Sequence, residues 1–155
     1  MKMHLGTLSI RSSAFTHGGR IPVRHTADGE GVSPPLVWSG APQGTRELAL
    51  ICHDPDAPMT HGFTHWVLYG IPSGTTELAE AGGQAFTDGV NETGSPGWMP
   101  PSPPPGHGDH FYYFHLFALD ARLGLDAGMS RSMLLDQIDD HVIEQARVVG
   151  LYSRA

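Results

Sequence analysis

The feature that most constrains this chain is an apolar run that ends in a turn stiffened by two prolines. Residues 48–52 are strand formers, and the sequence HDPDAP follows at 53–58. Proline fixes its own φ and pushes the preceding residue into extended geometry, so the turn is stiff. Stiff, charged turns at strand ends commonly bind ligands rather than contribute to packing. The sequence therefore places Asp54 and Asp56 at the rim of a sheet as candidate binding residues.

Composition favours a turn-rich β protein. With 155 residues, the chain is predicted to form one domain over residues 1–155. Only 16% of its residues are charged, while Gly (20) and Pro (13) are frequent, which is typical of β structure with many turns. Strands are predicted at 5–10, 36–39, 47–52, 65–71 and 111–119. The last of these is apolar on both alternating faces, so we expect it at the centre of a sandwich.

The pattern changes near the C-terminus. Apolar residues recur at helical spacing between 134 and 149, with Ser130 or Ser132 as a candidate N-cap and Gly150 as a stop. A C-terminal helix is therefore expected within 130–150. Residues 82–109 are rich in Gly and Pro and have almost no periodicity. A loop of that length between strands is usually functional.

Charge and cysteine content exclude several kinds of partner. The formal charge is -7 with only nine Lys and Arg and no basic stripe, so no nucleic-acid partner is expected. The lone Cys52 lies in an apolar run, which rules out an internal disulfide and predicts a buried thiol. Residues 1–6 have no apolar signal core, and no long apolar segment occurs elsewhere. We therefore expect no membrane insertion and a cytoplasmic location.

Acidic, imidazole and phenolic side chains recur at strand ends. Residues two apart share a face of a strand, so His110 and Tyr112 point the same way. Asp54 follows one strand, and His65 begins the next. If these rims coincide, one pocket collects Asp54, Asp56, His65, His110 and Tyr112. Such a pocket suits a small anion, because protonated imidazoles and a phenol donate to oxyanions, and the carboxylates are expected to keep the imidazoles cationic.

The same residues also have structural interpretations. Asp54 and Asp56 can serve only to form the turn. His65 can be a satisfied core histidine. His61 and His65 are four apart, but that spacing gathers metal ligands on a helix and not on a strand, so no metal site is predicted. No Gly-x-Ser-x-Gly elbow and no phosphate-binding Gly-rich loop occur, so neither a serine nucleophile nor a cofactor is predicted.

Four motifs in order resemble a known family. They are DGE at 28–30 with SPPLVW at 33–38, DPDAP at 54–58, HWVLYGIP at 65–72 and GHGDHFY at 106–112. Together they resemble the phosphatidylethanolamine-binding protein (PEBP) family, and more narrowly its bacterial Raf-kinase-inhibitor-like branch of the YbhB/YbcL type. The resemblance implies an antiparallel β-sandwich with Greek-key connections and peripheral helices. It also implies an anion pocket lined by Asp54, His65, His110 and Tyr112, with Asp56 in support and Pro105 at the wall.

The chain departs from that family pattern at three places. Phe111 stands where the motif has arginine, and Ala27 where the bacterial branch commonly has cysteine. The segment GWMPPSP at 97–103 is bulkier than the usual loop. Its Trp98 and Met99 are therefore predicted to line or cap the pocket.

Three functions stay open from the sequence. The first is a non-enzymatic, regulatory protein that binds a small anionic or phosphorylated molecule. The second is a small enzyme of secondary metabolism that uses Asp54 with His65 or His110 for acid–base catalysis of a cyclisation, dehydration or hydrolysis. The third, a kinase or protease inhibitor, rests on family analogy alone. Bacterial relatives are often dimeric, so a homodimer is a further expectation.

Overall fold

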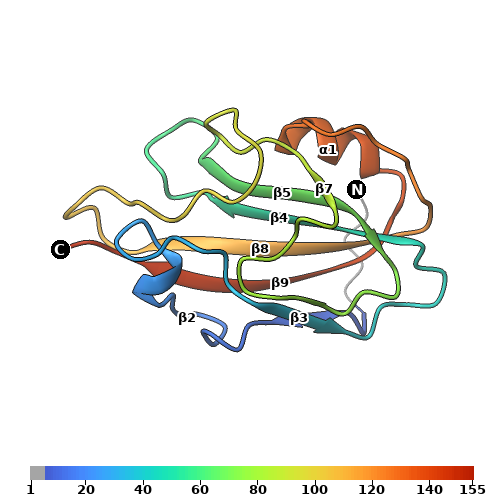
Figure 1. Cartoon of the computed structure of the whole chain (residues 1–155), viewed down its shortest axis with the longest axis horizontal. Helices are drawn as coiled ribbons and strands as arrows, with labels where there is room; N and C mark the ends of the chain where they lie inside the picture. The colour runs from blue at the N-terminus through green and yellow to red at the C-terminus, as the bar shows by residue number, and fades with distance from the viewer. Residues whose placement is uncertain (1–5) are drawn as a thin grey trace.

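Two sheets packed face to face form the protein in the computed structural model, which describes residues 6–155 (Figure 1). The larger sheet has the order β2-β9-β8-β4-β5-β7 and the smaller β1-β3-β6. The larger sheet consists of β2 (Gly19–Arg20), β4 (Glu47–Asp54), β5 (Phe63–Pro72), β7 (Thr87–Asp88), β8 (His110–Leu119) and β9 (Val142–Tyr152). The smaller consists of β1 (Ser9–Arg11), β3 (Leu36–Ser39) and β6 (Glu77–Leu78). The mainly β sandwich is confirmed, although β2 pairs with β9 in parallel.

The predicted strands correspond closely to observed ones. The strand predicted at 36–39 is β3, and those at 47–52, 65–71 and 111–119 are the cores of β4, β5 and β8. The first strand begins at Ser9. Its expected start at Leu5 lies outside the described residues, as does most of the N-terminal segment 1–6.

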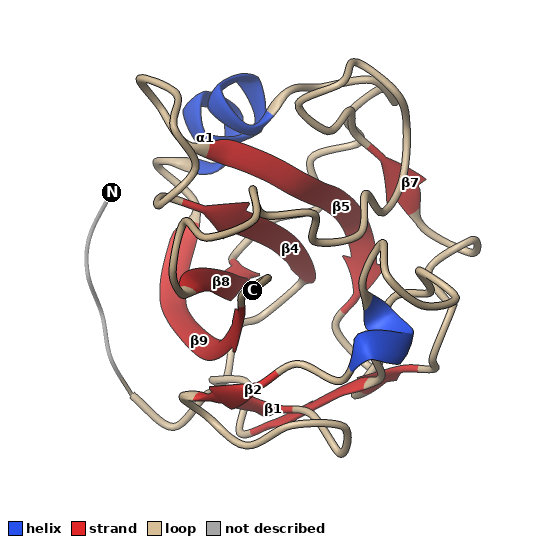
Figure 2. Ribbon diagram, turned by 90° about the vertical axis from the view of Figure 1, so that its left-hand side faces the viewer, coloured by secondary structure: helices blue, strands red, loops and turns tan. Residues whose placement is uncertain are grey.

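The hydrophobic core has two layers, one on each face of the larger sheet. The layer between the sheets includes Leu50, Cys52, Trp66, Phe114 and Leu116. The other layer lies beneath the helix α1 (Arg131–Ile138) and includes Ala49, Ile51, Val67, Phe117, Leu134 and Ile138. In Figure 2, α1 lies outside the sheet beside β5, and the short 3-10 helix η1 (Val23–His25) lies near the smaller sheet. Alternate residues of β4 therefore serve opposite layers, which explains the continuous apolar run.

The predicted C-terminal helix is present but much shorter than expected. Ser130 caps it, with its Oγ accepting a hydrogen bond from Met133 N–H at 3.3 Å. The helix ends at Ile138, and residues 142–152 form β9, which pairs antiparallel with β8 along its whole length. The prediction of helix beyond 138 was wrong because tertiary pairing outweighed the local spacing. Without β9, the buried strand β8 would leave a row of unpaired backbone groups.

Replacing Phe114 tests the inner layer. Phe114 is fully buried, so Phe114→Ala is expected to lower the free energy of unfolding by about 3–5 kcal/mol through lost burial and a cavity. Phe111, three residues earlier on the same strand, is 37% exposed, so Phe111→Ala should cost about 1 kcal/mol or less. Urea unfolding of the two variants provides the measurement. Equal losses would contradict this assignment of the core.

Candidate functional site

Three strand ends and two loops surround a cavity of about 210 Å³ at one rim of the sandwich. Asp54 ends β4, His65 lies early in β5, and His110 and Tyr112 lie at the start of β8. These four side chains, all predicted from the sequence, line the same cavity. The remaining lining residues come from the two proline-rich loops: Ala57, Pro58, Met59, Phe63, Met99, Pro100, Ser102, Pro103 and Pro104.

The buried Asp54 carboxylate accepts hydrogen bonds at both oxygens. Its Oδ1 accepts from the Asp56 N–H at 2.8 Å, and its Oδ2 lies 2.6 Å from His110 Nδ1. Because a carboxylate only accepts, His110 Nδ1 carries the proton of that bond. His110 Nε2 in turn lies 2.6 Å from Nδ1 of the exposed His107. A continuous hydrogen-bonded chain therefore runs from the buried carboxylate to the surface.

His65 is neutral at pH 7. Its Nδ1 donates to the Met99 carbonyl oxygen at 2.6 Å, which leaves Nε2 as an acceptor in the neutral ring. Burial lowers the pKa of this imidazole to about 4, and the nearby Asp54 charge only partly opposes that effect. The expectation that carboxylates keep the imidazoles cationic is therefore wrong for His65. The sequence showed the charges but not the depth of burial.

Tyr112 contributes a phenol that stays protonated. Burial, together with the Asp54 charge, raises the pKa of this group well above its ordinary value. Its ring meets the His65 ring edge-on at 5.2 Å between centroids. Within residues 6–155 no hydrogen-bond partner for the hydroxyl is present. The cavity thus presents one O–H donor next to one imidazole acceptor.

Three other predicted residues do not line the cavity. Asp56 is exposed, and its Oδ2 accepts from the Phe111 N–H at 2.8 Å, which ties the turn after β4 to the start of β8. Pro105 is exposed and does not line the cavity, whereas Pro103 and Pro104, which precede it, do. Trp98 stacks on Phe114 at 6.0 Å and belongs with the inner core layer, because that large ring fills space between the sheets. Its neighbour Met99 faces the cavity instead.

The sequence-based reasoning missed His107 and the apolar part of the wall. His107 was part of the GHGDHFY motif, and its position three residues before His110 was the available signal. Phe63 and Met59 were not singled out, although Met59 directly follows the DPDAP motif. Met59 is half exposed and lies at the cavity. The cavity is consequently more apolar than the sequence suggested.

Hydrogen bonds and an ion pair between Asp28 and residues near the C-terminus hold the proline-rich wall of the cavity in place. Arg154 forms a bidentate pair with Asp28, with N···O distances of 2.7 and 2.9 Å, and its Nη1 donates to the Pro103 carbonyl at 3.4 Å. The Tyr152 hydroxyl also donates to Asp28 at 2.7 Å. The DGE motif at 28–30 therefore positions the cavity wall rather than contacting the cavity itself.

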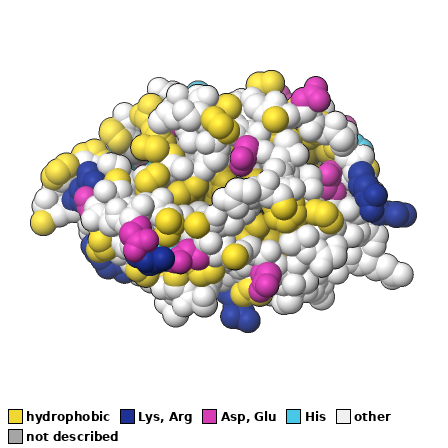
Figure 3. All heavy atoms as spheres, in the orientation of Figure 1, with side chains coloured by type: hydrophobic (Ala, Val, Ile, Leu, Met, Phe, Trp, Pro, Cys, Tyr) yellow, Lys and Arg dark blue, Asp and Glu magenta, His cyan; other side chains and the backbone are white. Residues whose placement is uncertain are grey.

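Other features limit what the site can contain. Across residues 6–155, no three His, Cys, Asp or Glu side chains converge where a metal ion would be held. Cys52 is buried as predicted, and burial raises the pKa of its thiol. No helix in the described part of the chain has the length and apolar character needed to cross a membrane. On the face seen in Figure 3, Lys and Arg lie at separate positions and form no continuous basic band.

The neutral state of His65 makes stability depend on pH. Its pKa in the folded state, about 4, lies below the ordinary value of 6.5, so the folded protein binds fewer protons than the unfolded chain. Its contribution is complete above pH 6.5 and is lost as the pH falls toward 4. We expect this group to remove about 1–3 kcal/mol of unfolding free energy over that window. Urea titrations at several pH values should show a smaller acid loss in His65→Gln; identical slopes would contradict the assignment.

Comparison with known proteins gives similarity over almost the whole chain. A family model described as phosphatidylethanolamine-binding protein matches residues 11–153. A UPF0098 protein from Methanothermobacter thermautotrophicus is 42% identical over 153 residues, which cover 95% of this chain and 99% of that protein. The crystal structure of a PEBP homologue from Chlamydia trachomatis is 34% identical, with a TM-score of 0.91, and covers 96% of this chain and 99% of that one. Escherichia coli YbcL, titled a member of the mammalian PEBP family, is 26% identical with a TM-score of 0.90 over 97% of this chain and 100% of that chain.

Proposed function

The chain belongs to the phosphatidylethanolamine-binding protein family, and we propose that its rim cavity binds the oxyanion group of a small carboxylate or phosphoryl compound. The observation that carries the proposal is the Tyr112 phenol beside the His65 imidazole in a cavity of about 210 Å³. Phosphoryl groups on small molecules and on modified proteins share this chemistry. A regulatory role would follow from capture of such a group.

The Asp54 charge is compatible with an anion at this place. Both of its oxygens already accept hydrogen bonds, one from Asp56 and one from His110. A ligand oxygen therefore meets the Tyr112 hydroxyl as a donor rather than a bare carboxylate. The rest of the wall consists of methionine, phenylalanine and proline side chains, which favour a ligand with a compact apolar part next to its charged group.

Binding of an anion should be coupled to uptake of a proton by His65. In the empty cavity its Nε2 is an acceptor and would repel an oxyanion. A bound anion favours the protonated ring, which raises the pKa of His65 from about 4. The affinity for an anion of constant charge must then increase as the pH falls, until the ring is already protonated in the free protein.

Isothermal titration calorimetry with acetate tests this coupling. The association constant should rise by up to about tenfold per pH unit as the pH falls from 7.5 to 6, where acetate stays ionised and His65 is neutral in the free protein. Phosphoethanolamine at constant pH provides the phosphoryl arm. An affinity for acetate that is flat or that falls over this range would contradict protonation at His65.

Removing the Tyr112 hydroxyl group should distinguish binding in the cavity from nonspecific binding elsewhere. Tyr112→Phe is expected to weaken acetate binding by about tenfold, because it deletes the donor and keeps the ring. Tyr113→Phe is the matched control: its ring lies on the opposite face of β8, stacked on His115. If both variants bind as the unmodified protein does, or if neither ligand produces heat, the proposed site is not used.

A second candidate function is acid–base catalysis, favoured by the hydrogen-bonded chain from Asp54 through His110 to His107. The two bonds in this chain are each 2.6 Å long and run from a buried carboxylate to an exposed imidazole. A carboxylate that orients an imidazole is a common arrangement for a general base. Because both ring nitrogens of His110 are engaged, the free acceptor of this chain is His107 Nε2 at its exposed end, where it would activate water or a ligand hydroxyl for hydrolysis or dehydration.

Hydrolysis of p-nitrophenyl acetate, a small activated ester, tests the catalytic alternative. If the chain acts as a base, Asp54→Asn should reduce the rate by about 100-fold or more, since the imidazole loses its orienting partner. His17→Gln, a change well away from the cavity lining, serves as the control. A rate equal to that of the buffer, or one unaffected by Asp54→Asn, would remove this candidate.

A further inference from the structure

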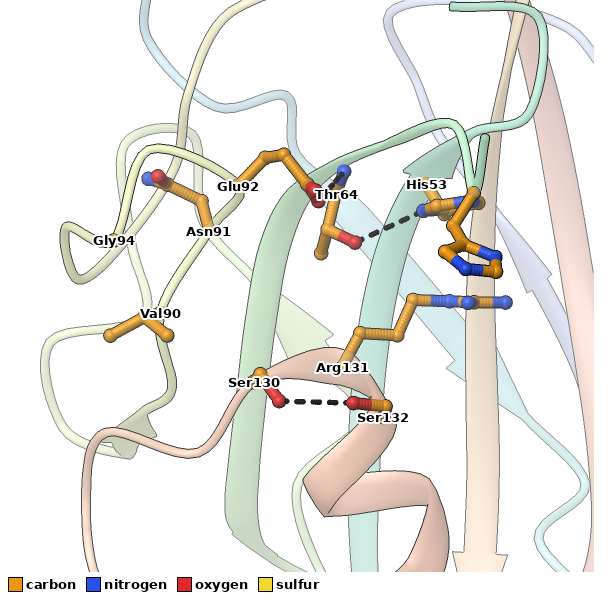
Figure 4. A pocket seen from close by; sticks show the side chains of 10 residues that line it. His53, Thr64, Val90, Asn91, Glu92, Gly94, Ser130, Arg131 and Ser132 are labelled. Atoms are coloured by element: carbon orange, nitrogen blue, oxygen red, sulfur yellow. Dashed lines mark hydrogen bonds between the residues drawn. The ribbon is translucent and has the colours of Figure 1, made fainter. Parts of the chain in front are cut away.

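A second cavity, larger than the first, lies on the opposite face of β4 and β5 (Figure 4). Its volume is about 550 Å³. His53 and Thr64 line it, whereas their chain neighbours Asp54 and His65 line the first cavity. A register shift between β4 and β5 interrupts the regular alternation here, so His65 faces the first cavity although Val67 packs beneath α1. The rest of its wall comes from the start of α1 and from the loop at 90–94. None of its lining residues belongs to the site proposed above.

The guanidinium of Arg131 is the main positively charged group that lines this cavity. Arg131 extends from the first turn of α1 toward the end of β4, near His53 (Figure 4). Within the described part of the chain its half-buried guanidinium has neither a hydrogen bond nor an ion pair. Burial lowers the pKa of this group, while Glu92 acts on it only as a charge at longer range. A guanidinium without a direct acceptor is poorly compensated where water is partly excluded.

The acidic and amide groups of the cavity are already engaged. The Glu92 Oε2 accepts from the Thr64 N–H at 3.1 Å, which fixes the loop against β5. The Asn91 side chain accepts from the Thr93 N–H at 3.0 Å and donates to the Gly97 carbonyl at 3.1 Å. These bonds fix the loop at 90–94, which forms one wall of the cavity. They leave Arg131 as the strong donor that still lacks an acceptor.

The histidines that line the cavity, His53 and His61, do not compensate the charge of Arg131. His53 Nδ1 lies 3.1 Å from the Thr64 hydroxyl. The His53 ring also bonds to the backbone of His61, and burial lowers its pKa, with the charge of Arg131 contributing. The imidazole rings of His53 and His61 supply no negative charge to Arg131. An oxyanion between Arg131 and the hydroxyl groups of Ser130 and Ser132 would supply one.

We propose that the cavity between the start of α1 and the loop at 90–94 is a second ligand site, which binds an oxyanion through Arg131. A carboxylate or phosphate group matches the planar fork of the guanidinium, which donates two parallel hydrogen bonds. The Ser130 and Ser132 hydroxyl groups are hydrogen-bonded to each other at 3.2 Å, so one O–H remains to donate to the ligand, and the N-terminal end of α1 adds a small favourable field. The volume of about 550 Å³ admits a ligand larger than the oxyanion itself.

Nuclear magnetic resonance titration with inorganic phosphate separates the two cavities. Amide shifts of Thr64, Asn91 and Arg131 report the second cavity, and those of Asp56, Ser102 and Tyr112 report the first. In the unmodified protein, the amide signals of Thr64, Asn91 and Arg131 should show saturable shifts. Arg131→Gln, which keeps chain length and helix propensity, should weaken that binding by about tenfold or more, and Arg131→Lys should restore part of it.

Arg46→Gln is the matched control, because it removes the same charge from an exposed arginine at the opposite end of β4. It should leave the phosphate affinity within twofold. Absence of saturable shifts around the second cavity, or equal affinity in Arg131→Gln and the unmodified protein, would overturn the proposal. Shifts confined to Asp56, Ser102 and Tyr112 would do the same while leaving the rim cavity intact. Shifts confined to the second cavity would support this proposal and count against the proposed function.

Discussion

The hydrogen bond between the Asp54 carboxylate and His110 joins the end of β4 to the start of β8 in the interior of the protein. Both groups are almost fully buried, and the two atoms are 2.6 Å apart. Removing two polar groups from water is costly, and loss of one partner from such a pair costs roughly 3–5 kcal/mol. The structure offsets that cost with the Asp56 amide on one side and His107 on the other. The rim cavity exists where it does because this bond fixes two strand ends, together with the loop that follows β4 and the loop that precedes β8.

The turn after β4 links the Asp54–His110 bond to further contacts with the start of β8. Asp56 Oδ2 accepts from the Phe111 N–H, so with the Asp54–His110 bond this turn is tied twice to β8. Gly62 closes the turn with φ of +70°, and a Cβ there would lie 2.4 Å from the Asp54 carbonyl oxygen. Only glycine fits that approach without displacement. Two prolines and one glycine thus restrict the conformation of this turn.

Strand alternation distributes function between those faces. Asp54 and His65 face the space between the sheets, while His53 and Thr64 face α1. The inner face combines a phenol, a neutral imidazole and apolar side chains. The outer face combines a guanidinium with hydroxyl groups. One pair of strands therefore presents two chemically different surfaces, and a shift of register by one residue would exchange them.

Local patterns were sufficient for most of the fold and for part of the site. Strands β3, β4, β5 and β8 follow from short-range apolar patterns and turn residues, whereas β6 and β7 were not predicted. The DPDAP and GHGDHFY motifs indicated Asp54, His110 and Tyr112. The outcome for residues 142–152 was different. Their spacing was compatible with a helix, but the open edge of β8 selected a strand. Trp98 likewise went to the core because a partner ring was available there.

By itself, the sequence determined that charged turns follow apolar strands and that His110 and Tyr112 share a strand face, because both depend on residues within a few positions of one another. It did not determine the face of His65, which a register shift between β4 and β5 places opposite Val67. Only the tertiary structure decided that His65 is neutral, that His107 extends the chain from Asp54 to the surface, and that Arg131 has no direct partner among residues 6–155. Those properties depend on burial and on contacts between residues far apart in the chain, for example 56 positions between Asp54 and His110. Desolvation and distance are set only when the sheets have packed.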